Sequence, residues 1–344
     1  MKRYFLLMPC MLGLLGCQAD ASPSAASQSI AADSPDVMDA YAIGQNVKAA
    51  IDAEDFAGLT AMEETFLQTR GRTPSGLWQL GSYYEALNRY LGEGLESDQG
   101  CQYRHAKFVQ RWMKADPLNP APAITGAALL LEQAWCIRGT GYADTVAADA
   151  WPTFKRGADA AAVLLEQNRK SASIDPEYYA VKLDVLRAQG ASKAAFRQVI
   201  DEATAREPGY HRTYFNAVWY YLPQWGGSYA EVDAFARYAA QRSRSAEGSG
   251  LYARIFLSLE ECDCHVLRQA ADWPTFKAAM HDIYDRYPGV SNAQRFALIS
   301  CEMGDTEEGH HFYRLLHPEV TNDSSFVAIF AGCDHQAKMF NDQS

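Results

Sequence analysis

The sequence has no block of basic residues and little positive charge overall. Its 344 residues include 31 Lys and Arg against 42 Asp and Glu, which gives a formal net charge of −11. Nucleic acids are bound mainly through cationic contacts to phosphates, so this balance argues against a nucleic-acid-binding protein. The same charge disfavours anionic lipid head groups, and any attachment to a membrane therefore needs another cause.

The apolar run at the N-terminus is too short to cross a bilayer. It extends over the 12 residues from Tyr4 to Leu15 and follows Lys2 and Arg3. A transmembrane helix needs about 20 apolar residues. A basic start followed by a short apolar run is typical of a signal peptide, and we assign residues 1–16 to one.

The apolar run ends at Leu14-Leu15-Gly16-Cys17, which resembles the lipobox of bacterial lipoproteins. In that motif a small residue precedes a cysteine that is acylated and becomes the new N-terminus. The resemblance implies that acyl chains on Cys17 hold the protein to a membrane surface. Lipoproteins retained at the inner membrane often carry Asp after the cysteine, whereas Gln18 implies the outer membrane, facing the periplasm. The alternative is an ordinary secretory signal with a chance cysteine.

The mature chain divides into a tether and a folded domain. Residues 17–35 comprise the acylated cysteine and a stretch rich in Ala and Ser, which is typical of a flexible linker. Residues 36–344 follow as a helical domain, with a sub-boundary near 170–175 left open. The chain is 48% apolar, which is enough to bury a sizeable core.

Familiar catalytic signatures are missing from the sequence. It contains no Gly-x-Ser-x-Gly elbow, no His-Glu-x-x-His motif and no Walker loop. The acidic pairs Glu63-Glu64 and Glu260-Glu261 are interpreted as solvated helix faces. His310, His311 and His317 lie in or beside one predicted helix. His310 and His317 share a face but are seven residues apart rather than four, so partly exposed polar positions are favoured over a metal pair. We therefore expect no enzymatic activity and no cofactor.

The cysteines indicate disulfide bonds in an exported protein. Of eight Cys, Cys10 would leave with the signal peptide and Cys17 would carry lipid, so six remain. An even number outside the cytosol suggests disulfides. Cys101 and Cys136 are a plausible pair. Cys262, Cys264, Cys301 and Cys333 can form two more bridges, and links from the Cys262/Cys264 segment to Cys301 and Cys333 are favoured.

A metal site is the alternative role for one of these segments. Cys262, Cys264 and His265 lie together in "ECDCHV". Thiolate and imidazole ligands at close spacing can hold zinc or copper(I). Cys-x-Cys differs from the usual Cys-x2-Cys knuckle, however, and an oxidising compartment competes for the thiols.

Helical periodicity continues along nearly the whole domain. Apolar residues recur at i, i+3, i+4 and i+7, as in Phe196, Val199, Ile200 and Ala203. In each of the doublets Tyr83-Tyr84, Tyr178-Tyr179 and Tyr220-Tyr221, one ring can face the core while the other lies near a groove and could bind a peptide or glycan, but most such rings simply pack helix against helix. The expected helix pairs are 37–53 with 55–70, 75–92 with 99–115, 120–138 with 144–169, 175–188 with 191–206, 209–222 with 228–243, 247–261 with 273–287, and 290–302 with 305–316. Two unit starts, at 175 and 209, are separated by the tetratricopeptide period.

The stretch "LPQWGGS" raises the question of an active-site loop. Ser228 and Glu231 form a capping box, so a helix is expected to start at Ser228. The preceding helix must end by Pro223. Trp225 and the two glycines are therefore interpreted as a helix–helix connection, with Trp225 packed between the two flanking helices.

Three stretches of the second half share a pattern with a known family. They are Leu222–Ser228; Asp272–Lys277 with Tyr287-Pro288; and Asn292 through Phe296-Ala297 with Cys301, Gly304 and Asp305. Together they resemble a bacterial family of unknown function, numbered four thousand and thirty-four, over about residues 180–316. A weaker likeness extends to Ser75–Leu80, and the pattern departs at Leu298-Ile299-Ser300. The resemblance implies a helical, repeat-like fold, and it transfers no activity and no functional residue.

The sequence thus predicts an all-α protein of antiparallel helix pairs, stacked as a tetratricopeptide-like solenoid or as a compact array. We expect a lipid-anchored binding or scaffold module at the cell envelope, with another envelope protein as its partner. The alternative is a metal-binding or thiol-active protein that uses Cys262, Cys264 and His265.

Overall fold

The structure is a computed structural model of the chain, and it describes residues 35–92, 101, 106–139, 141, 143–260, 266–316 and 330. Within these ranges the regular elements are helices, together with one isolated bridge between Arg72 and Trp78. The predicted all-α class is confirmed, and the helices pack as a compact array. Among the described helices, none has both the length and the apolar character that a bilayer span requires.

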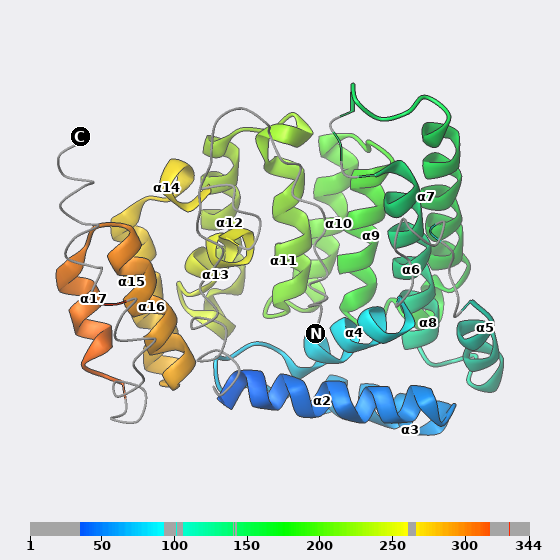
Figure 1. Ribbon diagram of the computed structural model, residues 1–344, viewed down its shortest axis with the longest axis horizontal. Helices are drawn as coiled ribbons and strands as arrows, with labels where there is room; N and C mark the ends of the chain where they lie inside the picture. The colour runs from blue at the N-terminus through cyan, green and yellow to red at the C-terminus, as the bar shows by residue number, and fades with distance from the viewer. Residues whose placement is uncertain are drawn as a thin grey trace.

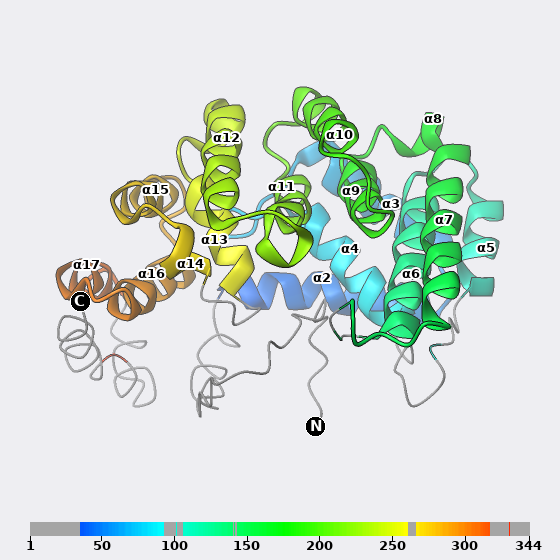
Figure 2. The same cartoon turned by 90° about the horizontal axis from the view of Figure 1, so that it is seen from above.

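Most helices stand in a row that follows the order of the chain (Figures 1 and 2). The row consists of α5 (Ala106–Ala115), α6 (Ala121–Arg138), α7 (Ala150–Gln167), α8 (Arg169–Ala172), α9 (Glu177–Ala188), α10 (Lys193–Arg206), α11 (His211–Val218), α12 (Tyr229–Glu247), α13 (Leu251–Leu259), α14 (Val266–Ala270), α15 (Trp273–Arg286), α16 (Val290–Glu302) and α17 (Thr306–Tyr313). Sequence neighbours pack together, as α6 does with α7 and α16 with α17.

The first three helices of the described residues lie across the row and form a base beneath it (Figure 1). They are α2 (Pro35–Asp52), α3 (Phe56–Thr69) and α4 (Gln79–Leu91). Helix α2 packs against α3 and α4, and it also contacts α16. The base therefore connects parts of the row that are far apart in the sequence.

The predicted pairing of 75–92 with 99–115 is wrong, because α4 packs mainly on α2, α3 and α6, whereas α5 packs on α6. Tyr83 and Tyr84 are both buried in α4, which packs against the other two helices of the base and against the row. Tyr178 and Tyr179 are likewise both buried in α9. In these two doublets neither ring lies at an open groove, and both pack helix against helix, which was the simpler interpretation. A helix packed on several sides buries consecutive residues.

The stretch around Trp225 is a turn between helices, as predicted. Two 3-10 turns, η2 (Trp219–Tyr221) and η3 (Pro223–Trp225), connect α11 to α12. The Ser228 hydroxyl caps α12 by accepting a hydrogen bond from the amide of Glu231 at 3.2 Å. Trp225 does not plug the gap between its flanking helices, however. Its ring packs against Trp135 of α6 at 5.6 Å between centroids, and the Arg187 guanidinium lies 4.8 Å from the ring centre.

Candidate functional site

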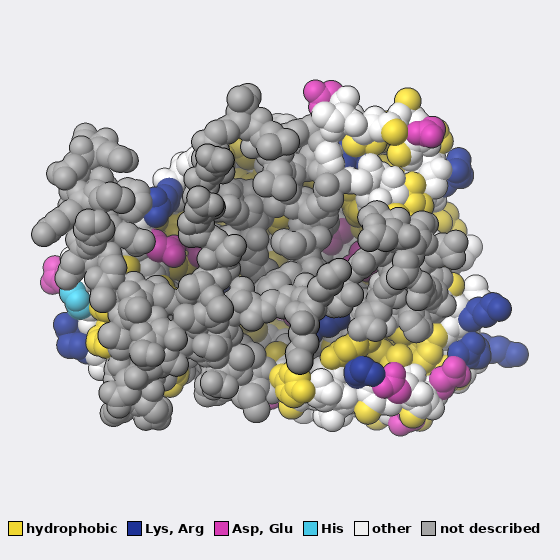
Figure 3. Space-filling model, in the orientation of Figure 1, with side chains coloured by type: hydrophobic (Ala, Val, Ile, Leu, Met, Phe, Trp, Pro, Cys, Tyr) yellow, Lys and Arg dark blue, Asp and Glu magenta, His cyan; other side chains and the backbone are white. Residues whose placement is uncertain are grey.

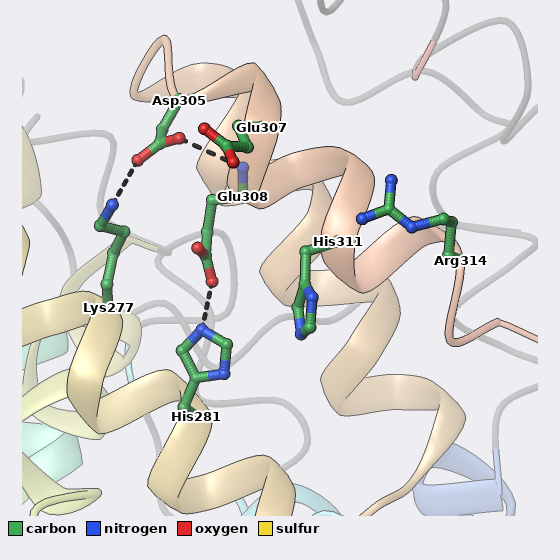
Figure 4. Close-up of a pocket in the computed structure, with 7 residues that line it drawn as sticks. All are labelled: Lys277, His281, Asp305, Glu307, Glu308, His311 and Arg314. Carbon is green, nitrogen blue, oxygen red and sulfur yellow. Dashed lines mark hydrogen bonds and ion pairs between the residues drawn. The ribbon is translucent and has the colours of Figure 1, made fainter.

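A hollow of about 300 Å³ lies between α15 and α17 towards one end of the row, and we call it the C-terminal pocket (Figure 4). All the side chains that line it are titratable, which makes this pocket the candidate site. Its lining consists of Lys277, His281, Asp305, Glu307, Glu308, His311 and Arg314.

Two helix starts place these side chains. The Asp272 carboxylate accepts a hydrogen bond from the Thr275 amide at 3.1 Å and caps α15. Asp305 caps α17 in the same way through the Glu308 amide at 3.2 Å. Lys277 and His281 are four residues apart and share one face of α15, and Glu308 and His311 are three apart and share one face of α17. These two faces line the pocket together.

Asp305 anchors one side of the pocket. Its Oδ2 accepts hydrogen bonds from Lys277 Nζ at 2.8 Å and from Trp273 Nε1 at 2.9 Å. Burial alone would raise the pKa of Asp305, but these bonds outweigh it and the pKa is lowered. Trp273, Lys277 and Asp305 all belong to the stretches that carry the family resemblance, and here they join α15 to α17. The hydrogen bonds among these three residues are explained by this link between the two helices.

The other side of the pocket holds an imidazole–carboxylate pair. His281 Nε2 lies 2.6 Å from Glu308 Oε1, and the side chains are 43% and 14% exposed respectively. The His311 ring lies 5.1 Å from the His281 ring, measured between centroids. The lining contains no Ser, Thr, Cys or Tyr that would serve as a nucleophile for covalent catalysis. The arrangement suits ligand or proton binding.

A second hollow, of about 250 Å³, lies between the end of α3 and the helices α9 and α10. Its basic side chains are already paired: Arg70 lies 2.7 Å from Glu207, and Arg206 lies 3.7 Å from Glu202. Ile174 stands 62% exposed beside it. These contacts make the hollow a weaker candidate than the C-terminal pocket.

A buried charge cluster ties the loop of residues 70–78 to the row. Arg72 lies 2.9 Å from the carboxylate of Glu247, which is 1% exposed. Burial lowers the pKa of His211 to about 4, so this imidazole is neutral beside Glu247. Arg254 donates a hydrogen bond to the Ser75 carbonyl at 2.6 Å. None of these side chains lines either of the two hollows described above, and their contacts join the loop to α12 and α13.

Glu63 is buried rather than solvated, so the solvated-face interpretation of the first acidic pair is wrong at this residue. Its side chain is 1% exposed and accepts a hydrogen bond from Asn119 at 2.9 Å. Burial raises the pKa of Glu63 to about 7. Tertiary packing of α3 against the row covers Glu63, while its neighbour Glu64 remains exposed. Burial also raises the pKa of Glu260, in the second acidic pair, to about 7.

The structure joins Cys101 and Cys136 in a disulfide, with Cα atoms 5.7 Å apart, which confirms that predicted pair. Cys301 is also disulfide-bonded. Cys17, Cys262, Cys264, His265 and Cys333 lie outside the described residues, so lipidation and the cysteine metal site stay predictions.

Of the three histidines predicted to lie in or beside one helix, only His311 lines the C-terminal pocket. His310 lies on α17 with its ring 5.4 Å from that of Phe330, and His317 lies outside the described residues. His281 was missed because it lies 30 residues before His311 in the sequence. The spacing Glu308-x-x-His311 was the available signal, and only the packing of α15 beside α17 gives it a partner.

Comparisons with known proteins add no assignment, since no family model, no curated protein and no solved structure matches the chain.

Proposed function

We propose that this protein is an exported lipoprotein, anchored through Cys17 to the outer membrane and facing the periplasm, where its helical array works as a binding or scaffold module. The observation that carries the proposal is the N-terminal pattern: Lys2 and Arg3, a short apolar run, and Leu14-Leu15-Gly16-Cys17. Residues 18–35 would act as a tether between the lipid and the helical array.

The disulfide supports export. Cys101 and Cys136 are bonded, and disulfides persist in the periplasm but are rare in the cytosol. The resemblance to the bacterial family of unknown function implies a helical, repeat-like fold and adds no chemistry.

The described surface carries polar, charged and apolar side chains, which supports the binding of a folded partner through polar and apolar contacts. The described part of the face in Figure 3 carries charges of both signs, with lysine and arginine near α5 and hydrophobic side chains near the base. The large exposed apolar residues are dispersed over separate segments, as Tyr41, Leu118 and Val163 are. We therefore propose another envelope protein as the partner, bound by polar and apolar contacts together.

Metabolic labelling with a fatty-acid analogue tests the anchor. The wild-type chain expressed in a Gram-negative host should take up label and sediment with outer-membrane vesicles, whereas Cys17→Ser should lose both properties. Cys10→Ser is the matched control, because this residue lies within the proposed signal peptide, and it should behave as wild type. Unlabelled wild-type protein, or label retained by Cys17→Ser, would overturn the proposal. Cross-linking in intact cells then identifies the partner.

A further inference from the structure

We propose that His281, Glu308 and His311 bind one divalent transition-metal ion, of the zinc type, in the C-terminal pocket. The ion would join α15 to α17 through their side chains. This site differs from the cysteine cluster predicted from the sequence, and it does not depend on the lipid anchor.

The spacing of the three residues suits metal binding. Glu308 and His311 are three residues apart on α17, so both project from one helix face. Glu-x-x-His pairs on helices supply metal ligands in helical bundles, with the remaining ligands coming from facing helices. His281 occupies that facing position on α15 (Figure 4).

Two distances, between the rings of His281 and His311 and between His281 and Glu308, are compatible with a shared ion once the third side chain turns towards it. Two imidazoles that bind one zinc ion at about 2.0–2.1 Å have ring centres roughly 5 Å apart. The His281 and His311 rings are 5.1 Å apart. The 2.6 Å between His281 Nε2 and Glu308 Oε1 would widen by about 0.7 Å around a tetrahedral ion.

One carboxylate oxygen of Glu308 is available as a metal ligand. Its Oε1 is buried, and no described donor makes a hydrogen bond of good geometry to it, although the His281 imidazole is close. Buried carboxylate oxygens are costly without a donor or a cation. A metal ion at this point would satisfy the oxygen directly.

Formation of the site needs one side chain to turn. Among the described residues, no three His, Cys, Asp or Glu side chains already stand close enough to hold an ion. His311 is partly exposed, and its described contacts are with the rings of His281 and Phe312. Side chains of this kind change rotamer within nanoseconds, so the turn is easily made.

The donor set selects the class of ion. Two imidazoles and one carboxylate suit Zn²⁺, Co²⁺, Ni²⁺ or Cu²⁺ better than Mg²⁺ or Ca²⁺. Asp305 is not available as a fourth ligand, because Lys277, Trp273 and the Glu308 amide already bind it. Three protein ligands would leave one position open towards the pocket, where water or a small anion can bind.

Metal titration of the full-length chain in detergent, after treatment with EDTA, tests the site. We expect one Zn²⁺ per chain by calorimetry. His281→Ala and His311→Ala should each weaken the affinity by about tenfold or more. His310→Ala is the matched control, since it removes a neighbouring imidazole of α17 outside the proposed set, and its affinity should equal that of wild type.

Two further measurements separate the site from folding defects and from the cysteines. Glu308→Gln keeps the shape of the side chain and should lose affinity while its circular dichroism stays unchanged. Co²⁺ bound at this site should show d–d absorption without a thiolate charge-transfer band. Absence of binding by wild type, full affinity in His281→Ala, or loss of binding only in Cys262→Ser/Cys264→Ser would each overturn the proposal.

Discussion

Glu63 and Asp175 meet in the protein interior, where neutral side chains donate to both. Asn119 donates to Glu63 at 2.9 Å, and the Tyr84 hydroxyl donates to Asp175 at 2.6 Å. Burial raises the pKa of both carboxyl groups. The charge of Glu63 raises the pKa of Asp175 further, whereas the hydrogen bond with Asp175 lowers the pKa of Glu63 in part. The two groups therefore titrate as a pair that retains a proton near neutral pH.

The pair makes stability depend on pH. The pKa of Glu63 is raised from 4.5 to about 7 by burial, so the folded state favours the protonated form. Its contribution to the free energy of unfolding is full below pH 4.5 and is lost as the pH rises towards 7. Glu63→Gln stays neutral, and it should be more stable than wild type at pH 8 by about 1–3 kcal/mol.

Urea unfolding at pH 5 and pH 8 checks this prediction. The exposed neighbour Glu64→Gln is the control. Its charge raises the pKa of Glu63 less than burial does, so it should shift stability at pH 8 much less than Glu63→Gln. An equal shift of Glu63→Gln at the two pH values would show that the carboxyl does not titrate as described.

At the scale of the element, the connection between α11 and α12 depends on two glycines for different reasons. Gly226 has φ = +80°, a conformation that favours glycine, and a Cβ there meets nothing within 4 Å. A Cβ on Gly227 would lie 2.1 Å from the Tyr221 carbonyl oxygen. Glycine is therefore needed at 226 for the left-handed backbone conformation, and at 227 because the backbone there passes close to the Tyr221 carbonyl.

The two glycines should respond differently to alanine. Gly226→Ala should lower the free energy of unfolding by about 1 kcal/mol, the usual cost of a left-handed alanine. Gly227→Ala forces the backbone of the turn apart and should cost about 3 kcal/mol or more. Chemical denaturation of both variants measures the difference, and equal losses would contradict the close-approach explanation.

At the scale of the whole molecule, the loop of residues 70–78 fastens the base to the row. Arg70 reaches Glu207 after α10, and Arg72 reaches Glu247 at the end of α12. The Ser75 carbonyl accepts hydrogen bonds from Arg254 of α13 and Asn292 of α16. One loop therefore links the N-terminal helices to four separate parts of the row.

Breaking the buried ion pair of this loop should destabilise the entire array. Arg72→Met removes the ion pair that Arg72 makes with the buried Glu247, and it should cost about 3–5 kcal/mol. The double variant Arg72→Met/Glu247→Met should lose less than the sum of the single variants, because neither charge is left unpaired. Arg111→Met is the control, since both partners of the Arg111–Glu54 pair are about half exposed and such pairs contribute about 0–1 kcal/mol.

The prediction is tested by thermal unfolding of Arg72→Met, Glu247→Met, the double variant and Arg111→Met. Unfolding is followed with two probes, far-UV circular dichroism and tryptophan fluorescence. The two probes should report one transition that shifts together. Separate transitions for the base and the row, or additive losses in the double variant, would show that the loop does not couple them.

Local sequence patterns predicted the helical class, most helix boundaries and the cap at Ser228, and they indicated Cys101 and Cys136 as a plausible pair. These features follow from periodicity, capping and cysteine number, which act within a few turns of chain or are counted directly. Tertiary structure alone decided that α2–α4 lie across the row, that Glu63 is buried, and that His281 faces Glu308 and His311. Each of these depends on which surfaces meet across long separations, where many similar apolar faces compete and the local pattern does not distinguish between them.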